Sequence, residues 1–206
     1  MIPPPPSSTP LYSSSASDVY KRQMQAYQNA IKIQPNYAEP HNNLGQTLLL
    51  TGNLHQGWKE YEWRWKCKDF SSEIRHFPQV LWDGSDLNDK SILVWTEQGV
   101  GDQIMFASML HDLSHMEANI ITDCDIRLIP LFKRAFPKIQ IFPRDYPPVQ
   151  QLLDTNIDYQ IPIGSLGRWL RSTPKNFKVK NIIADVHTVP GSVEAIDKAF
   201  SLAEAI

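Results

Sequence analysis

Between residues 91 and 161 the chain alternates short apolar runs with helical segments, and this alternation limits the possible folds more than any other feature. Four runs have the length of buried strands: residues 91–96, 119–122, 139–142 and 158–161. Helical spacing of apolar residues follows the first run from Ile104 to Leu113. Further helices are expected from Asp125, as a cap, to Phe136 and over residues 147–153. Strands and helices joined by short connections predict a Rossmann-like parallel sheet of the α/β class.

The turn after the first predicted strand carries the most chemical information. It reads Glu97-Gln98-Gly99-Val100-Gly101-Asp102. Glycines between a strand and a helix let the backbone turn sharply and let a ligand approach closely. Ligands of open α/β folds bind at the carboxyl edge of the sheet, where this turn is expected to lie. The turn lacks the remaining elements of a dinucleotide fingerprint and of a P-loop, so neither NAD nor P-loop nucleotide binding is predicted.

Residues 24–66 carry a helical repeat pattern. Tyr27 and Tyr61 lie 34 residues apart, which is the period of tetratricopeptide repeats. Small residues such as Gly45 are expected where two helices approach closely, and Gly52 and Asn53 are expected to form the turn and cap the next helix. The pattern therefore predicts a helical hairpin of the tetratricopeptide type. The alternative interpretation is an ordinary helical hairpin.

Both ends of the chain differ in character from its middle. Residues 1–17 are rich in proline and serine and predict disorder. Residues 18–23 (DVYKRQ) resemble a translated transposon end of the kind used in sequencing libraries, and our hypothesis is that residues 1–23 are partly or wholly such an artefact and are disordered. Residues 178–206 could form a strand, a turn and a helix, but their relation to the preceding residues is not apparent. The expected units are thus residues 24–70 and 71–177.

Composition excludes several classes of protein. The net charge of −2 does not indicate a nucleic-acid-binding protein, which would carry an excess of basic residues. No apolar run approaches the ~20 residues of a membrane span. The N-terminus lacks a secretory signal pattern. Cys67 and Cys124 form no CxxC pair, so neither a disulfide framework nor a zinc ribbon is expected and a cytoplasmic location is predicted.

Several separated motifs resemble bacterial tetratricopeptide-repeat proteins that carry a glycosyltransferase-like domain. The matching stretches are residues 57–65, 81–87, 97–102, 127–137 and 158–166. The resemblance covers about residues 24–177 and implies half of a GT-B fold, in which two Rossmann-like domains face each other across a cleft. It implies that this half holds the acceptor, and that the nucleotide-sugar binds to a second half missing from the chain. Such a fragment is not expected to transfer sugar alone.

The resemblance also implies roles for individual residues. In related heptosyltransferase-like families an aspartate at this turn acts as general base, which makes Asp102 the candidate catalytic residue. Candidate substrate-binding residues are Glu97, Gln98, Gly99, Gly101 and Ser165. No cofactor or metal is expected, because the resemblance implies metal-free transfer.

Plainer interpretations stand beside these roles. Asp102 is equally suited to cap a helix, and the two roles can coexist. His111 and His115 have the i, i+4 spacing of zinc ligands but lack a third ligand, so solvent-facing histidines are expected. The tryptophans at 58, 63 and 65 could stack on sugar, but packing against the next domain is the commoner use at this spacing.

Three functions compete on the sequence alone. The first is the acceptor half of a glycosyltransferase, and the second is a non-catalytic scaffold that binds protein partners through the repeat. A flavodoxin-like regulator is disfavoured by the motifs at 57–65 and 81–90.

Overall fold

The computed structural model describes residues 12–153 and 155–177, with side chains from residue 18 onward. The chain divides into two compact units, Met1–Phe70 and Ser71–Ile206. The strand, turn and helix suggested for residues 178–206 lie outside the described residues. No helix in the described ranges is both long and apolar enough to cross a membrane.

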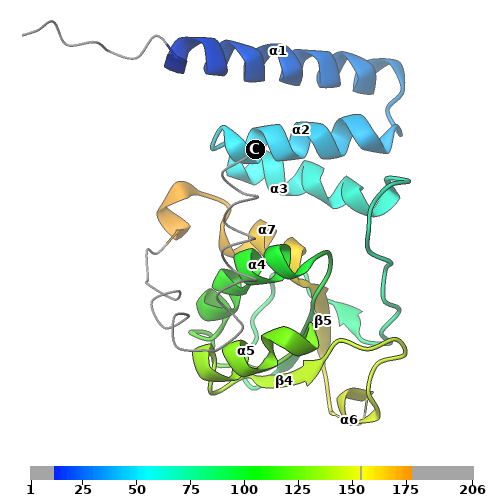
Figure 1. Ribbon diagram of the computed structural model, residues 1–206, viewed down its shortest axis with the longest axis vertical. Helices are drawn as coiled ribbons and strands as arrows, with labels where there is room; N and C mark the ends of the chain where they lie inside the picture. Colours follow the sequence, from blue (N-terminus) through cyan, green and yellow to red (C-terminus); the bar gives the residue numbers. More distant parts are fainter. Residues whose placement is uncertain (1–11, 154, 178–206) are drawn as a thin grey trace, which may run out of the picture. The chain divides into compact units, whose positions relative to one another are not determined.

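The first unit is helical. It contains α1 (Tyr12–Ile33), α2 (Ala38–Leu50), α3 (Leu54–Tyr61) and the 3₁₀ turn η1 (Glu62–Lys66). Figure 1 shows α2 between α1 and α3. The expected disorder was wrong for residues 12–23, which belong to α1. This stretch contains no glycine or proline and is continuous with the helical segment that follows, so the helix can propagate through it.

The packing of α2 on α3 explains the glycines of this unit. A Cβ atom on Gly45 would lie 2.6 Å from the backbone nitrogen of Tyr61, so only glycine permits this approach. Gly52 has φ +82° in the turn between the helices, as expected. Asn53 occupies the N-cap position of α3, but its side chain makes no capping hydrogen bond, so that detail of the prediction was wrong.

The second unit is a five-stranded parallel sheet with helices, in the order β1-β5-β2-β3-β4. Its strands are β1 (Val80–Leu81), β2 (Ser91–Trp95), β3 (Asn119–Cys124), β4 (Gln140–Pro143) and β5 (Tyr159–Pro162). The α/β prediction is thereby confirmed, with four strands at the predicted places. β1 was missed because it is two residues long and exposed.

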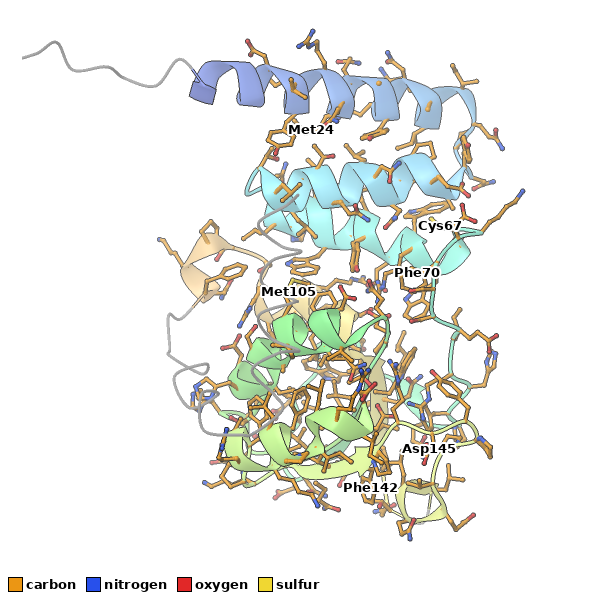
Figure 2. All side chains as sticks on the ribbon, viewed as in Figure 1. Met24, Cys67, Phe70, Met105, Phe142 and Asp145 are labelled. Carbon is orange, nitrogen blue, oxygen red and sulfur yellow. The ribbon has the colours of Figure 1, made fainter. Side chains whose placement is uncertain are left out.

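Helices and short helical turns connect these strands. They are α4 (Val100–Leu113), η2 (Ile126–Leu128), α5 (Ile129–Ala135), α6 (Gln150–Leu153), η3 (Ile163–Ser165), α7 (Gly167–Leu170) and η4 (Pro174–Asn176). Asp125 caps η2 by accepting a hydrogen bond from the Arg127 amide, close to the expected place. The predicted apolar face of α4 is only partly correct, because Met105, labelled in Figure 2, is 58% exposed.

The core of this unit lies around β2. Ile92, Leu93 and Val94 are fully buried, so both faces of this central strand are covered. From β2 the chain moves outward through β3 to β4, and β5 then pairs with the opposite edge of β2. The direction of the strand order thus reverses between β2 and β5. Such a reversal creates the crevice at the carboxyl edge where ligands bind in open α/β sheets.

Candidate functional site

The predicted site residues lie on two segments that flank this reversal point. Trp95 and Pro162 are partners in the register of β2 and β5, so the segments that follow the two strands begin at the same level. Glu97, Gln98 and Gly99 follow β2, while Gly101 and Asp102 lie in the first turn of α4. Ser165 ends η3, which follows β5.

Asp102 both caps α4 and remains partly exposed. Its Oδ2 atom accepts a hydrogen bond from the Gly99 amide at 3.0 Å, which is one half of a capping box. Gly99 has no side chain, so the reciprocal half cannot form. The capping role that competed with catalysis is therefore present, and the role of general base stays a prediction.

The sharp bend in this turn is made by Gln98 and not by a glycine. Gln98 has φ +59°, in the left-handed region that non-glycine residues rarely adopt. Gly99 has φ −82° and ψ 176°, which any residue can adopt. A Cβ atom on Gly99 would approach Oδ2 of Asp102 to 3.4 Å. The expectation that the glycines provide the special backbone conformation was wrong, because distant side chains stabilise it at Gln98.

Two hydrogen bonds hold Gln98 from opposite sides. Its amide donates to Oγ of Ser72 at 2.5 Å, and its carbonyl accepts from Nη1 of Arg144 at 3.0 Å. Arg144 follows β4, and its own amide donates to the Cys124 carbonyl at 2.7 Å. Neither side chain was singled out from the sequence, because both lie far from the turn along the chain.

Glu97 joins the two segments of the site. Its side chain is fully buried, and its carboxylate accepts a hydrogen bond from the Gly164 amide at 3.1 Å. Ser165, the next residue, is also buried. These positions suit a role in fixing the segments at the reversal point, and contact of either residue with substrate stays a prediction.

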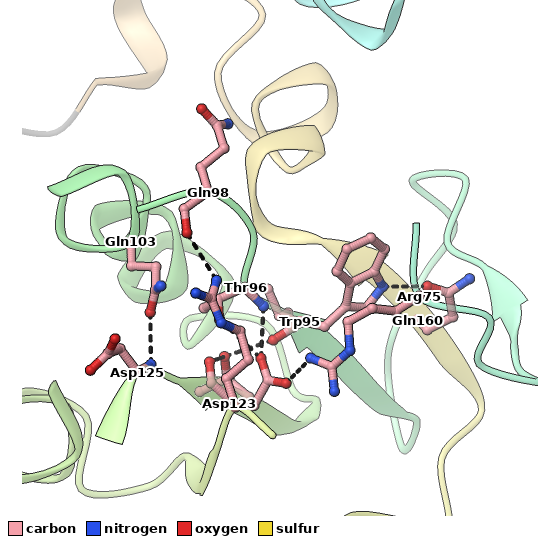
Figure 3. Close-up of polar contacts among 11 residues, drawn as sticks. Arg75, Trp95, Thr96, Gln98, Gln103, Asp123, Asp125 and Gln160 are labelled. Carbon is pink, nitrogen blue, oxygen red and sulfur yellow. Dashed lines mark hydrogen bonds and ion pairs between the residues drawn. The ribbon is translucent and has the colours of Figure 1, made fainter. Parts of the chain in front are cut away.

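A buried ion pair lies at the end of the neighbouring strand. Asp123 accepts hydrogen bonds from the Thr96 amide at 2.7 Å and the Thr96 hydroxyl at 3.1 Å, and it pairs with Arg75. Figure 3 shows Asp123 between Thr96 and Arg75. Burial raises the pKa of the Asp123 carboxyl, against the lowering effects of Arg75 and Thr96. Within the described residues, Nε and Nη2 of Arg75 have no hydrogen-bond partner.

The next acidic residue, Asp125, has a different environment. Hydrogen bonds donated by the guanidinium of Arg127 lower the pKa of the Asp125 carboxyl to about 2. Its amide donates to Oε1 of Gln103 at 2.9 Å, which links β3 to α4 (Figure 3). The sequence showed that two aspartates flank Cys124, but it contained no signal that only Asp123 is paired with Arg75, 48 positions away.

The histidine pair does not form part of a recognisable metal centre. The rings of His111 and His115 lie edge to face with centroids 4.6 Å apart. Across the part of the chain that the structure describes, no group of three or more His, Cys, Asp or Glu residues could hold a metal ion.

A cavity of about 430 Å³ lies in the helical unit and not at the sheet edge. It is lined by residues of α1, α2 and α3 together with the turn before α3: Gln28, Ile31, Lys32, His41, Leu44, Leu48, Asn53, Gln56 and Glu60. His41 is fixed in its wall, with Nδ1 2.6 Å from Oε2 of Glu60 and the ring stacked on Trp63. The helical unit therefore has its own recess, separate from the chemistry of the carboxyl edge.

The tryptophans of the helical unit serve packing. Trp58 is buried, and its ring meets that of Tyr61 edge to face. The side chain of Arg64 is fully buried, with its guanidinium 4.6 Å from the ring centroids of Tyr61 and Trp65. These contacts all lie within the helical unit, so packing of the cluster against the next domain stays a prediction.

Comparisons with known proteins give a family match and a curated relative. Residues 24–52 match the model of the TPR repeat. Over 97 residues the chain is 37% identical to Protein FlbA of Caulobacter vibrioides. The match covers 46% of this chain but 16% of that protein, so the chain corresponds to a small part of its relative. No solved structure matches the chain. The chain thus contains a TPR repeat followed by a parallel α/β unit, and it is similar over part of its length to FlbA.

Proposed function

We propose that the sheet unit is the acceptor-binding half of a GT-B-type glycosyltransferase, whose nucleotide-sugar half lies outside the described residues. The observation that carries the proposal is the position of Asp102. This partly exposed carboxylate starts the helix after β2, beside the reversal point of a parallel sheet. Ligands of open α/β sheets bind at this place, and the motifs at 81–87 and 97–102 resemble the glycosyltransferase-like family.

The proposed reaction needs a base on the acceptor side. Asp102 takes the proton of the acceptor hydroxyl while the hydroxyl oxygen forms a bond to the anomeric carbon of the sugar. The bond between the anomeric carbon and the nucleotide phosphate breaks, and the nucleotide leaves with the electrons of that bond. Oδ2 of Asp102 accepts the hydrogen bond of the Gly99 amide, and the residue is partly exposed. The proposal assigns the proton to Oδ1, the other oxygen of this carboxylate. The proposal places this reaction in the cytoplasm and assigns no transfer activity to residues 24–177 alone.

The test uses the complete coding sequence that contains these residues. The purified protein is incubated with labelled UDP-, GDP- and CMP-sugars and a lysate of the source cells, and transfer of label to macromolecules is measured. We expect Asp102→Asn to lower turnover at least tenfold, within the ~10²–10⁴-fold typical of a general base. Unchanged turnover at unchanged thermal stability would remove Asp102 from the mechanism.

Asp89→Asn is the matched control. Asp89 lies just before β2, at the amino end of the strand, and has φ +57°, which asparagine tolerates well. This substitution removes the same charge from the opposite end of the same strand. It is expected to leave turnover unchanged.

A second function is favoured by the cavity in the helical unit and by the TPR match. We propose that this unit binds a protein partner in the recess lined by Gln56 and Glu60. A photo-crosslinking amino acid at Gln56 should capture one defined partner, whereas the same probe at the exposed His55, which does not line the recess, should not. If the protein is only a scaffold, capture persists and no sugar is transferred by any variant.

A further inference from the structure

We propose that Ser72 and Arg144 are positioning residues, which hold the peptide between Gln98 and Gly99 in the one orientation that aims the carboxylate of Asp102. The catalytic consequence rests on the proposed function, whereas the conformational role does not. None of the motifs in the sequence pointed to either residue.

A single peptide plane links Arg144 to Asp102. The carbonyl of this peptide belongs to Gln98 and accepts from Nη1 of Arg144 at 3.0 Å. Its N–H belongs to Gly99 and donates to Oδ2 of Asp102 at 3.0 Å. A trans peptide is planar, with C=O and N–H pointing in opposite directions. Fixing the carbonyl with Arg144 therefore fixes the direction in which the N–H reaches Asp102.

The preceding peptide needs the second contact. Gln98 has φ +59°, where its Cβ atom is crowded by its own backbone, so the turn would relax if nothing opposed it. The Gln98 amide donates to Oγ of Ser72 at 2.5 Å, which fixes the peptide on the other side of the same Cα atom. With both flanking peptides held, rotation about φ and ψ of Gln98 is restrained.

Both clamping residues are tied to the end of β3. The Arg144 amide donates to the carbonyl of Cys124 at 2.7 Å. Arg75, three residues after Ser72, forms the buried ion pair with Asp123. The side chains that hold Gln98 thus come from segments fixed to a strand of the sheet, and they can impose a conformation that the local sequence does not favour.

The first experiment measures amide hydrogen exchange in the 206-residue chain and needs no ligand. Ser72→Ala and Arg144→Met should each raise the exchange rate of the Gly99 amide at least tenfold, with little change in the strands. Ser72→Thr retains the hydroxyl and should retain protection. Arg127→Met is the matched arginine control, because Arg127 pairs with Asp125 outside the turn, and it should leave Gly99 unchanged.

A rescue variant separates positioning from general support. Glycine adopts positive φ without the steric penalty of a Cβ atom, so Gln98→Gly should restore much of the protection lost in Ser72→Ala. Unchanged Gly99 exchange in both single variants would overturn the proposal. Loss of protection that spreads equally over β2, β3 and β5 would also overturn it, because the residues would then only stabilise the sheet.

The second experiment measures turnover in the complete protein. Arg144→Met should lower kcat with little change in KM, and the double variant with Asp102→Asn should be no slower than Asp102→Asn alone. If the double variant is slower than Asp102→Asn alone by the full factor that Arg144→Met causes by itself, Arg144 does not act through Asp102. If the exchange results hold but Asp102→Asn leaves turnover unchanged, the clamp stands and the proposed function fails.

Discussion

The two units of the chain place their special residues by different means. In the helical unit, a close approach is made by residues whose own size permits it, as at Gly45, where a Cβ atom would meet the Tyr61 backbone. In the sheet unit, the equivalent decisive position is Gln98, whose conformation is maintained by Ser72 and Arg144. The sequence therefore identifies a position such as Gly45 directly, because the residue type itself permits the contact. A position such as Gln98 depends on residues that are distant along the chain.

The largest expected effect concerns the buried ion pair of the sheet unit. Asp123→Ala leaves Arg75 buried without its carboxylate, and breaking such a pair costs about 3–5 kcal/mol. Urea unfolding should show this loss. Cys124 provides a local readout: its side chain is fully buried, so a reagent reaches the thiol only when the sheet opens.

Asp125→Ala is the control for this substitution. Asp125 comes directly after β3, two residues from Asp123. Its partner Arg127 is exposed, and exposed ion pairs contribute about 0–1 kcal/mol to the free energy of unfolding. If Asp123→Ala and Asp125→Ala lower the free energy of unfolding equally, the buried ion pair stabilises the fold no more than the exposed pair does. In that case the ion pair does not anchor the carboxyl edge.

A smaller effect is expected in the helical unit. Gly45→Ala places a methyl group 2.6 Å from the Tyr61 nitrogen and should destabilise this unit by about 1–3 kcal/mol, the usual cost of overpacking. Hydrogen exchange followed by mass spectrometry should show faster exchange in α2 and α3. Peptides from the sheet should exchange at an unchanged rate. An equal rise in exchange rate across both units would contradict the division of the chain into two units.

Gly52→Ala tests a different cause in the same unit. A Cβ atom there meets nothing within 4 Å, but the residue has φ +82°. The expected cost is about 1–2 kcal/mol from the left-handed conformation alone. Gly52→Asn should recover part of it, because asparagine tolerates this region.

The same contrast explains what could be predicted from sequence. Apolar runs identified β2 to β5 because their apolar residues are at least partly covered in the sheet, whereas β1 has only Val80 and Leu81, both exposed. The turn after β2 was placed correctly at the carboxyl edge. Its geometry was assigned to the glycines, since a single sequence cannot reveal that Arg144 will reach Gln98 across 46 positions.

The position of the candidate site residues in the fold was predictable to the same extent. Asp102 was singled out by its place after a strand and a glycine-containing turn, which are local features. The burial of Glu97 and its bond to Gly164 depend on β5 joining β2, a pairing that local periodicity does not specify. The pairing of Asp123 with Arg75 likewise depends on where the segment before β1 lies. Long-range topology is therefore the information that was missing.

The smallest expected effect is a pH dependence that separates the two aspartates on either side of Cys124. Bonds from Arg127 lower the pKa of folded Asp125 from 3.8 to about 2, so this residue contributes stability above pH 3.8 that is lost as the pH falls toward 2. Burial raises the pKa of Asp123 above 3.8, so its contribution has the opposite sign and decreases as the pH rises from that value. Asp125→Asn should therefore flatten the acid limb of a plot of unfolding free energy against pH. A limb of unchanged slope would mean that solvent screening removes the effect of the exposed Arg127 on the pKa of Asp125.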